Sequence, residues 1–266
     1  MRKIIILFLT IVFLTTLSAC SEVITYDDLS ADYQTYVTSN EDIYTSYIDY
    51  FNHLSTTTVQ SVVQIRKNVI PSLGSGTGSG VIFHSDALFY YVLTNHHVVY
   101  SVSTNVSYQV VDFKGNVLNA FLFATDSAYD LAVLRFRKLA NVFPIAELAP
   151  INPVKDHRIS VIGYPNFQVN AIVIGQTDGY QRVNIGTSGS QAEINVDFDV
   201  LITTASVKSG SSGSPVFDDQ YHVVGIVYAG NFATNSNISV RSFVIPIEKV
   251  REFLTAQGIV VGGTTS

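Results

Sequence analysis

Between residues 59 and 246 the chain alternates apolar and polar residues over short stretches, and this period of two predicts β-strands. The expected strands fall in two sets, and the stretch 144–153 is expected to connect them. The first set covers 59–66, 81–83, 88–94, 106–113, 117–124 and 131–137, and the second covers 158–164, 169–175, 180–185, 192–198, 200–204, 214–218, 222–229 and 240–246. Many short strands separated by Gly, Asn and Pro favour an all-β fold built from two barrels.

A glycine-rich run, Gly74-Ser-Gly-Thr-Gly-Ser-Gly80, precedes the strand expected at 81–83. A phosphate-binding loop would carry Lys-Ser or Lys-Thr directly after such a run and would lead into a helix. Neither feature is present, so residues 71–80 are expected to form a flexible connection that enters a strand.

The period changes near both ends of the chain. Residues 20–54 are expected to form a helical extension, because their apolar residues recur mainly at steps of three and four, as in one or two amphipathic helices. These residues are Tyr33, Tyr36, Val37, Ile43, Tyr44, Tyr47, Ile48, Phe51 and Leu54. Residues 248–257 are expected to be a C-terminal helix that ends at Gly258, which leaves 258–266 as a tail.

The first residues have the composition of an export signal. Arg2 and Lys3 precede an uncharged apolar run from Ile4 to Leu17, so residues 1–19 are interpreted as a secretory signal. Leu17-Ser-Ala-Cys20 resembles the bacterial lipobox, which would place a diacylglyceryl group on Cys20 and anchor the exported chain to a membrane. The alternative is a chance cysteine in an ordinary cleaved signal. Cys20 is the only cysteine, so no intramolecular disulfide is possible.

Charge is spread unevenly along the sequence. The net charge is −6, of which residues 21–54 carry −7 and residues 55–266 carry −1. A nearly neutral main region with no basic run argues against nucleic acid as a partner. With one cysteine and no clustered ligand spacing, neither a metal nor another cofactor is expected.

A glycine-flanked serine is the first candidate for chemistry. Gly210-Ser-Ser-Gly213 precedes the apolar strand Pro215-Val-Phe217, and it holds Ser212 between small residues. A nucleophilic serine needs an exposed hydroxyl and backbone N–H groups aimed at the developing oxyanion, and glycine permits that backbone. Clusters of small residues are more often plain turns, so this pattern alone does not identify Ser212 as a nucleophile.

Two stretches upstream supply the partners that such a serine needs. Thr94-Asn-His-His-Val-Val99 is a strand that runs into histidine, and Asp126-Ser-Ala-Tyr-Asp130 ends in an aspartate at the start of another strand. Their order along the chain is His, Asp, Ser, one of the known orders for a serine nucleophile with a charge-oriented base.

From about residue 55 to residue 257 the sequence resembles the trypsin-like, chymotrypsin-fold serine peptidases. Residues 94–99 and 126–134 match the histidine and aspartate motifs of the HtrA/Deg type, while 210–217 and Ile162-Gly-Tyr-Pro165 look more like the bacterial glutamyl endopeptidases and exfoliative toxins. The resemblance implies two six-stranded antiparallel Greek-key barrels, here with a C-terminal helix and an N-terminal helical extension. It also implies an activity, serine endopeptidase.

The family motifs assign roles to individual residues. Ser212 is expected to be the nucleophile, His97 the general base and then acid, and Asp130 the group that fixes the imidazole tautomer. The backbone N–H groups of Gly210 and Ser212 are expected to form the oxyanion hole.

Three neighbouring residues are weaker candidates for the same roles. His96 does not directly precede Val98-Val99, as the motif requires, and Asp126 does not abut the apolar strand at 131–134. Ser188 is also flanked by glycine, in Gly186-Thr-Ser-Gly189, but it lacks the following Pro-Val-Phe strand and is expected to lie in a hairpin turn.

The expected substrate-binding residues are Ser206, Tyr228, Ala229 and Gly230. Ser206 occupies the position where trypsin-type enzymes read basic side chains, and Val227 occupies the position of the substrate-reading histidine of glutamyl enzymes. Both charged specificities lack their recognition group, so small or medium uncharged side chains are expected. Residues 228–230 are expected to pair with the substrate backbone.

Ser211 replaces the aspartate that pairs with a new N-terminus in trypsin, so that mode of activation is not expected.

The sequence thus predicts an exported, lipid-anchored serine endopeptidase that acts on proteins or peptides. One rival is a non-catalytic binding module of the same fold at the cell surface. Another is an esterase, disfavoured because residue 214 is Ser and breaks the Gly-x-Ser-x-Gly elbow. The extension at 20–54 is interpreted as a spacer docked on the barrel, or alternatively as a segment that covers the substrate cleft or binds a partner.

Overall fold

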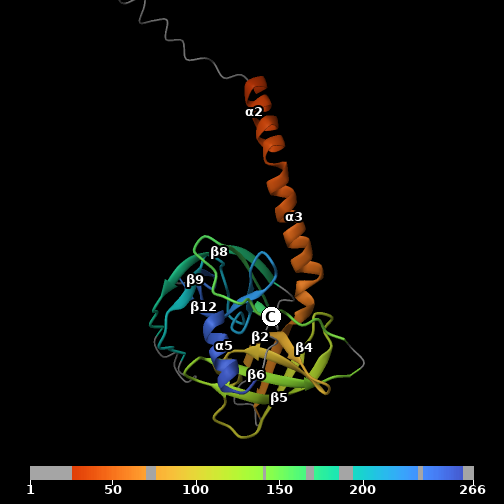
Figure 1. Cartoon of the computed structure of the whole chain (residues 1–266), viewed down its shortest axis with the longest axis vertical. Helices are drawn as coiled ribbons and strands as arrows, with labels where there is room; N and C mark the ends of the chain where they lie inside the picture. The colour runs from red at the N-terminus through yellow and green to blue at the C-terminus, as the bar shows by residue number, and fades with distance from the viewer. Residues whose placement is uncertain are drawn as a thin grey trace, which may run out of the picture. The chain divides into compact units, whose positions relative to one another are not determined.

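The computed structural model describes residues 26–69, 76–139, 142–165, 171–185, 194–232 and 236–259 (Figure 1). The expected signal at 1–19 and Cys20 lie outside these residues. The boundary between two compact units of the chain falls between Asp49 and Tyr50. In the ranges given above, no helix is both long and apolar enough to cross a membrane.

The first barrel is a closed antiparallel sheet of six strands in the order β1-β2-β3-β6-β5-β4. Its strands are β1 (Val62–Val69), β2 (Gly76–Ser85), β3 (Phe89–Thr94), β4 (Val106–Val111), β5 (Val117–Asp126) and β6 (Leu131–Arg137). Alternate side chains such as Val63 and Ile65 of β1 and Leu134 and Phe136 of β6 fill its interior, as the period of two predicts.

The second barrel is also closed, with the strand order β10-β11-β12-β9-β8-β7. Its strands are β7 (Arg158–Gly163), β8 (Ala171–Gln181), β9 (Val200–Thr203), β10 (Pro215–Phe217), β11 (Val223–Phe232) and β12 (Ser239–Pro246). The predicted all-β fold of two six-stranded antiparallel barrels is therefore confirmed.

Helices occur at both ends of the described chain, as expected. Helix α5 (Ile247–Ala256) buries Ile247, Val250, Phe253 and Leu254. Arg251 on this helix donates to the carbonyl oxygens of Leu148 and Ala149 at 2.8 and 2.9 Å, which ties α5 to the connection between the barrels. The N-terminal extension forms α2 (Tyr26–Ser39) and α3 (Glu41–Thr56). A short 3-10 turn, η1 (Thr58–Ser61), leads from α3 into β1.

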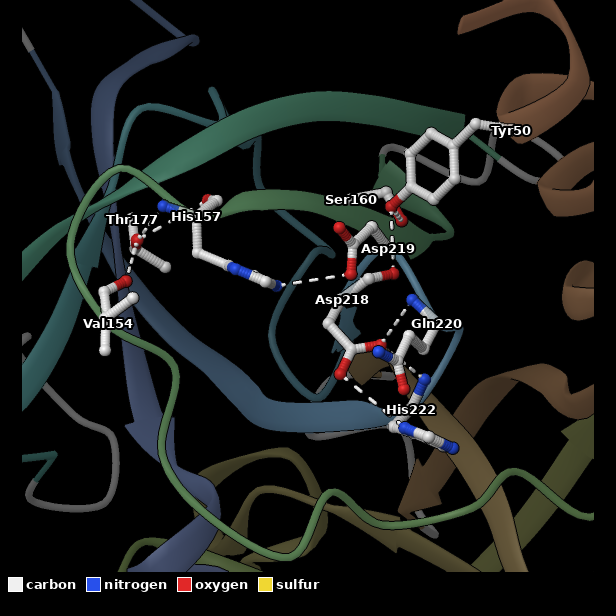
Figure 2. Close-up of polar contacts among 9 residues, drawn as sticks. All are labelled: Tyr50, Val154, His157, Ser160, Thr177, Asp218, Asp219, Gln220 and His222. Atoms are coloured by element: carbon white, nitrogen blue, oxygen red, sulfur yellow. Dashed lines mark hydrogen bonds and ion pairs between the residues drawn. The ribbon is translucent and has the colours of Figure 1, made fainter. Parts of the chain in front are cut away.

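The last turns of α3 belong to the barrel unit and are packed into it. Tyr50 and Leu54 are buried. The Tyr50 hydroxyl lies 3.1 Å from both Ser160 Oγ and the carbonyl oxygen of Asp218, and Figure 2 shows it pointing at the turn between β10 and β11. The Asp218 carboxylate closes that turn by accepting from the backbone N–H groups of Gln220 and His222. Burial raises the pKa of Tyr50 to about 12.

Four predicted elements differ from the structure. Residues 59–61 of the strand expected at 59–66 lie in the 3-10 turn η1, and β1 begins at Val62. Residues 76–80 of the glycine run are the first half of β2 rather than a flexible connection. The strands expected at 169–175 and 180–185 form one bent strand, β8, from Ala171 to Gln181. Residues 194–198 of the strand expected at 192–198 are not in a strand.

Candidate active site

His97 lies on a one-turn helix, α4 (His96–Val99), that follows directly from β3. Asn95 ends the strand in extended backbone, and its side-chain amide donates to the carbonyl oxygen of Asp130 at 3.0 Å. The backbone N–H of His96 donates to the same oxygen at 3.1 Å. These two bonds fix the start of α4 against the segment that carries Asp130.

Asp130 ends the turn between β5 and β6 in left-handed backbone, with φ 49°, and it is fully buried. Its Oδ2 lies 2.7 Å from His97 Nδ1, and its Oδ1 accepts from the His97 backbone N–H at 2.9 Å. Such a carboxylate favours the tautomer with the proton on Nδ1, which leaves Nε2 free to accept a proton. The side chain of His97 is 18% exposed, so its ring remains accessible.

Ser212 lies in a tight turn with glycine in left-handed backbone on both sides, at Gly210 (φ 90°) and Gly213 (φ 83°). Ser211 closes the turn, since its N–H donates to the Lys208 carbonyl at 3.0 Å and its Oγ accepts from the Lys208 N–H at 3.3 Å. The turn therefore has the small residues and backbone that the nucleophile assignment requires.

Strand β2 connects the serine turn to the histidine segment. The backbone N–H of Ser79 donates to the Ser212 carbonyl at 2.8 Å. A Cβ added to Gly78 would lie 2.7 Å from Val98 Cγ1 and 3.1 Å from the Ser212 carbonyl oxygen, so both residues approach the bare backbone of Gly78. A Cβ on Gly213 would collide with Thr94 Oγ1 and the Ser79 carbonyl. The fold thus brings the backbone of Ser212 beside α4.

The hydrogen bonds of the three proposed catalytic side chains are formed on the Asp130 side of His97. Among the described residues no hydrogen bond joins Ser212 Oγ to the His97 ring, whereas the bond between His97 and Asp130 is formed. Hydrogen bonds to a nucleophile are often long in a site without substrate and shorten when substrate binds.

Ser79 is a residue of this region that the sequence reasoning missed. It is fully buried, its Oγ donates to the Gly210 carbonyl at 3.0 Å and accepts from the Tyr164 N–H at 2.9 Å. Its carbonyl accepts from Thr94 Oγ1 at 2.7 Å. Ser79 therefore links the serine turn, the strand before His97 and the second barrel. The glycine run at 74–80 was the available signal, because small residues allow close backbone approach.

The weaker candidates have other surroundings. His96 Nδ1 lies 2.6 Å from Thr125 Oγ1, and burial lowers the pKa of its ring. Asp126 accepts from the backbone N–H of Ala128, within its own turn. Ser188 lies outside the described residues. Across the described ranges, no group of three His, Cys, Asp or Glu side chains has the arrangement of a metal site.

The expected substrate-binding residues lie on two segments near the serine turn. Ser206 lines a cavity of about 100 Å³ together with Ser211 and Gly163. Tyr228 is 1% exposed, and its hydroxyl has no hydrogen-bond partner among the described residues. Burial, and after it the negative charge of Asp130, raises the pKa of Tyr228. Ala229 and Gly230 are half-buried.

Strand β11 has a free edge next to the serine turn. Strand β10 pairs with β11 only as far as Ile226, and Val227 then exchanges backbone hydrogen bonds with Gly213 and Ser214. Within the ranges that the structure describes, no backbone segment pairs with that edge at 228–230, while the opposite edge pairs with β12. An extended peptide has room to add there as a strand.

Comparison with known proteins identifies the family. The family model described as trypsin-like peptidase domain matches residues 78–226, which include His97, Asp130, Ser212 and β2 from Gly78 on. The chain belongs to the trypsin-like peptidase domain family. The predicted relationship to bacterial trypsin-like serine peptidases is thereby confirmed.

The sequence identity between this chain and individual known proteins is low. The serine protease Do-like HtrA of Bacillus subtilis is 32% identical over 156 residues, which cover 57% of this chain and 33% of that protein. The chain thus matches about a third of its relative's length. The active form of the Rv3671c protease from M. tuberculosis has a TM-score of 0.64 at 23% identity, covering 82% of this chain and 91% of that one. The HtrA-type protease AlgW with a tripeptide has a TM-score of 0.62 at 24% identity, covering 79% of this chain and 63% of that one.

Proposed function

We propose that this chain is an exported serine endopeptidase, anchored to a membrane through Cys20, that hydrolyses peptide bonds of proteins outside the cytoplasm. The single observation that carries the proposal is the buried Asp130 carboxylate, which holds both Nδ1 and the backbone N–H of His97 at 2.7 and 2.9 Å. A carboxylate buried against a histidine, next to a glycine-flanked serine, is the arrangement that activates a serine hydroxyl.

The reaction would proceed in two steps. His97 Nε2 takes the proton of Ser212 Oγ as the oxygen attacks the scissile carbonyl, and the same proton passes to the leaving amine when the peptide bond breaks. A water molecule then attacks the acyl-serine, with His97 again accepting and returning a proton. Asp130 stabilises the imidazolium in each step.

The negative oxygen of the tetrahedral intermediate would be stabilised by the N–H groups of Gly210 and Ser212. Neither N–H has a backbone partner among the bonds of the described turn, which is consistent with this role. Losing one such donor typically costs about 10²- to 10³-fold in rate.

Substrate recognition would combine the free edge of β11 with the cavity that Ser206 lines together with Lys208. Residues 228–230 offer backbone groups for an added strand, whereas the Tyr228 side chain is too buried to meet a substrate side chain. Ser206 offers no charge, so cleavage after small or medium uncharged residues is expected. A peptide-library profile dominated by Glu, Arg or Lys would contradict this preference.

The proposal does not require cleavage of the chain for activation. Residue 211 is a serine and has no carboxylate to pair with a new N-terminus. It is buried, and its hydroxyl accepts a hydrogen bond from the Lys208 N–H. A chain that becomes active only after a cut that creates a buried amino terminus would contradict it.

A fluorophosphonate probe tests the catalytic assignment without a known substrate. We expect covalent labelling of the wild type and loss of labelling, by roughly 10⁴-fold or more, in Ser212→Ala and in His97→Ala. Ser209→Ala is the matched control, because Ser209 is an exposed serine of the same loop and its loss is expected to leave labelling unchanged.

The rival interpretation is a non-catalytic binding module of the same fold at the cell surface. The same probe separates the two, since a binding module would not be labelled.

Export and anchoring are tested separately by incorporation of a labelled fatty acid, which Cys20→Ala is expected to abolish.

A further inference from the structure

Helices α2 and α3 carry a heptad repeat. Along them the steps between large side chains alternate between four and three residues, as at the a and d positions of a coiled coil. These positions are Leu29, Tyr33, Tyr36, Asn40, Ile43, Tyr47, Tyr50 and Leu54, with Tyr33, Asn40, Tyr47 and Leu54 at a. Seven of the eight are apolar or aromatic, and the one polar residue, Asn40, lies in the middle.

Most of this stripe is exposed to solvent. Tyr50 and Leu54 are packed in the barrel unit, at 4% and 0% exposure, but the side chains from Leu29 to Tyr47 are 44–63% exposed at the apolar a and d positions. Tyr44 and Phe51, which flank the stripe at e positions, are also exposed. Helices in water owe most of their stability to packing of the apolar face, so an exposed stripe of this size indicates a binding surface.

The charges are arranged so that identical stripes can meet. The acidic residues from 27 to 49 fall at the outward b and c positions, except Asp32 at g, and residues 21–54 contain no Lys or Arg. Self-association would therefore bring no acidic pair into the contact between helices. The repulsion between outward carboxylates is screened over about 8–10 Å at physiological salt.

We propose that residues 26–49 associate with the same residues of further copies of this chain as a parallel, in-register coiled coil, about 36 Å long. Asn40 sets the orientation. In a parallel coil an a residue meets the a residue of its partner, so the two Asn40 side chains lie opposite each other. In the single chain Asn40 Nδ2 donates to the Tyr36 carbonyl oxygen at 2.8 Å, and pairing between copies uses Oδ1 and the second N–H of each amide. In an antiparallel coil a residues meet d residues, and Asn40 would face the apolar Tyr36 and Ile43.

Association of the processed chain, residues 20–266 with Cys20→Ser, tests the proposal. Sedimentation at concentrations on the order of tens of micromolar is expected to give an oligomer. Ile43→Asp, which puts a charge at a d position, is expected to weaken association by about 100-fold or more, whereas Thr45→Asp at the outward f position leaves it unchanged. A monomeric wild type, or an oligomer that Ile43→Asp does not affect, overturns the proposal.

Cross-linking tests the orientation independently of any effect on folding. In the Cys20→Ser background, Tyr33→Cys at an a position is expected to form an intermolecular disulfide on mild oxidation, and Ala31→Cys at an f position is not. In an antiparallel coil residue 33 would lie far from its copy, so absence of the Tyr33→Cys cross-link contradicts the parallel arrangement. Probe labelling of Ser212 is expected to be the same in all of these variants, so the outcome is separate from the proposed catalysis.

Discussion

Gly78 and Gly213 are two glycines that lie between the serine turn and the segment around His97. Neither position has room for a methyl group, because backbone and branched side chains from the opposing segments fill the space. At Gly213 the left-handed backbone is a second reason for glycine, since other residues rarely adopt it. These glycines determine how the backbone of Ser212 reaches the segment that carries His97.

Gly78→Ala is therefore expected to lower the probe-labelling rate about 10- to 100-fold while the protein stays folded, because the new methyl would displace Val98 and the Ser212 carbonyl. Gly76→Ala is the matched control in the same strand. There the new Cβ would meet only the flexible end of Lys67, 3.2 Å away, so a small effect is expected. Equal labelling rates for the two variants, with equal melting temperatures, would contradict this account.

At the scale of elements, the last turns of α3, from Tyr50 on, are attached to the β10–β11 turn within the barrel unit. Tyr50 contributes its ring to the core and its hydroxyl to two hydrogen bonds, to Ser160 and to the Asp218 carbonyl. His53, one turn further along α3, stacks on Tyr221 with ring centroids 3.8 Å apart. The aromatic residues of the helix thus hold its last turns on the β10–β11 turn.

Tyr50 makes this attachment sensitive to alkaline pH. Burial raises its pKa from 10.0 to about 12, so the folded state keeps the phenol proton longer than the unfolded state does. The stabilisation is complete below pH 10 and is lost as the pH rises from 10 towards 12. Between pH 10 and 12 the unfolding free energy of the wild type is expected to fall by about 1 kcal/mol more than that of Tyr50→Phe, which has no phenol proton to lose at residue 50. Urea unfolding at each pH measures both values. Tyr100→Phe, at an exposed position outside the proposed coiled coil, should behave like the wild type.

At the scale of the whole molecule, the proposed chemistry belongs to one of the two units. The unit that begins at Tyr50 contains both barrel cores and His97, Asp130 and Ser212. The helical residues 26–49 contribute no member of the proposed site. Their proposed task is association between copies, which is separate from peptide hydrolysis.

Deletion of residues 26–49 is therefore expected to change the probe-labelling rate by less than about 3-fold, since the proposed site keeps all of its groups. A deletion extended to residue 54 also removes Tyr50 and Leu54 from the core, and should cost roughly 2–5 kcal/mol of unfolding free energy. A change in labelling of about 10-fold or more by the shorter deletion, at unchanged melting temperature, would favour the interpretation in which the extension covers the substrate cleft.

Patterns within the chain were enough to predict the all-β class, the two sets of strands, the terminal helices and the family. These features depend on local periodicity and on motifs of a few residues, which can be read along the sequence. Residues Gln176 to Gly179 show the limit of that reading. They look like a turn, but β8 continues through them with a shift in register and a left-handed Gly179 (φ 113°), so its two halves serve one barrel.

How the candidate site is held together became apparent only from the packed barrels. Ser79 is inconspicuous in the sequence, yet closing the two barrels brings it to Gly210, Tyr164 and Thr94, which lie 15 to 131 residues away along the chain. The bare backbone of Gly78, next to it in β2, lies between Val98 and Ser212. Contacts over such separations form only when the cores of both barrels pack. No local sequence pattern therefore predicts which distant backbone groups will contact Ser79.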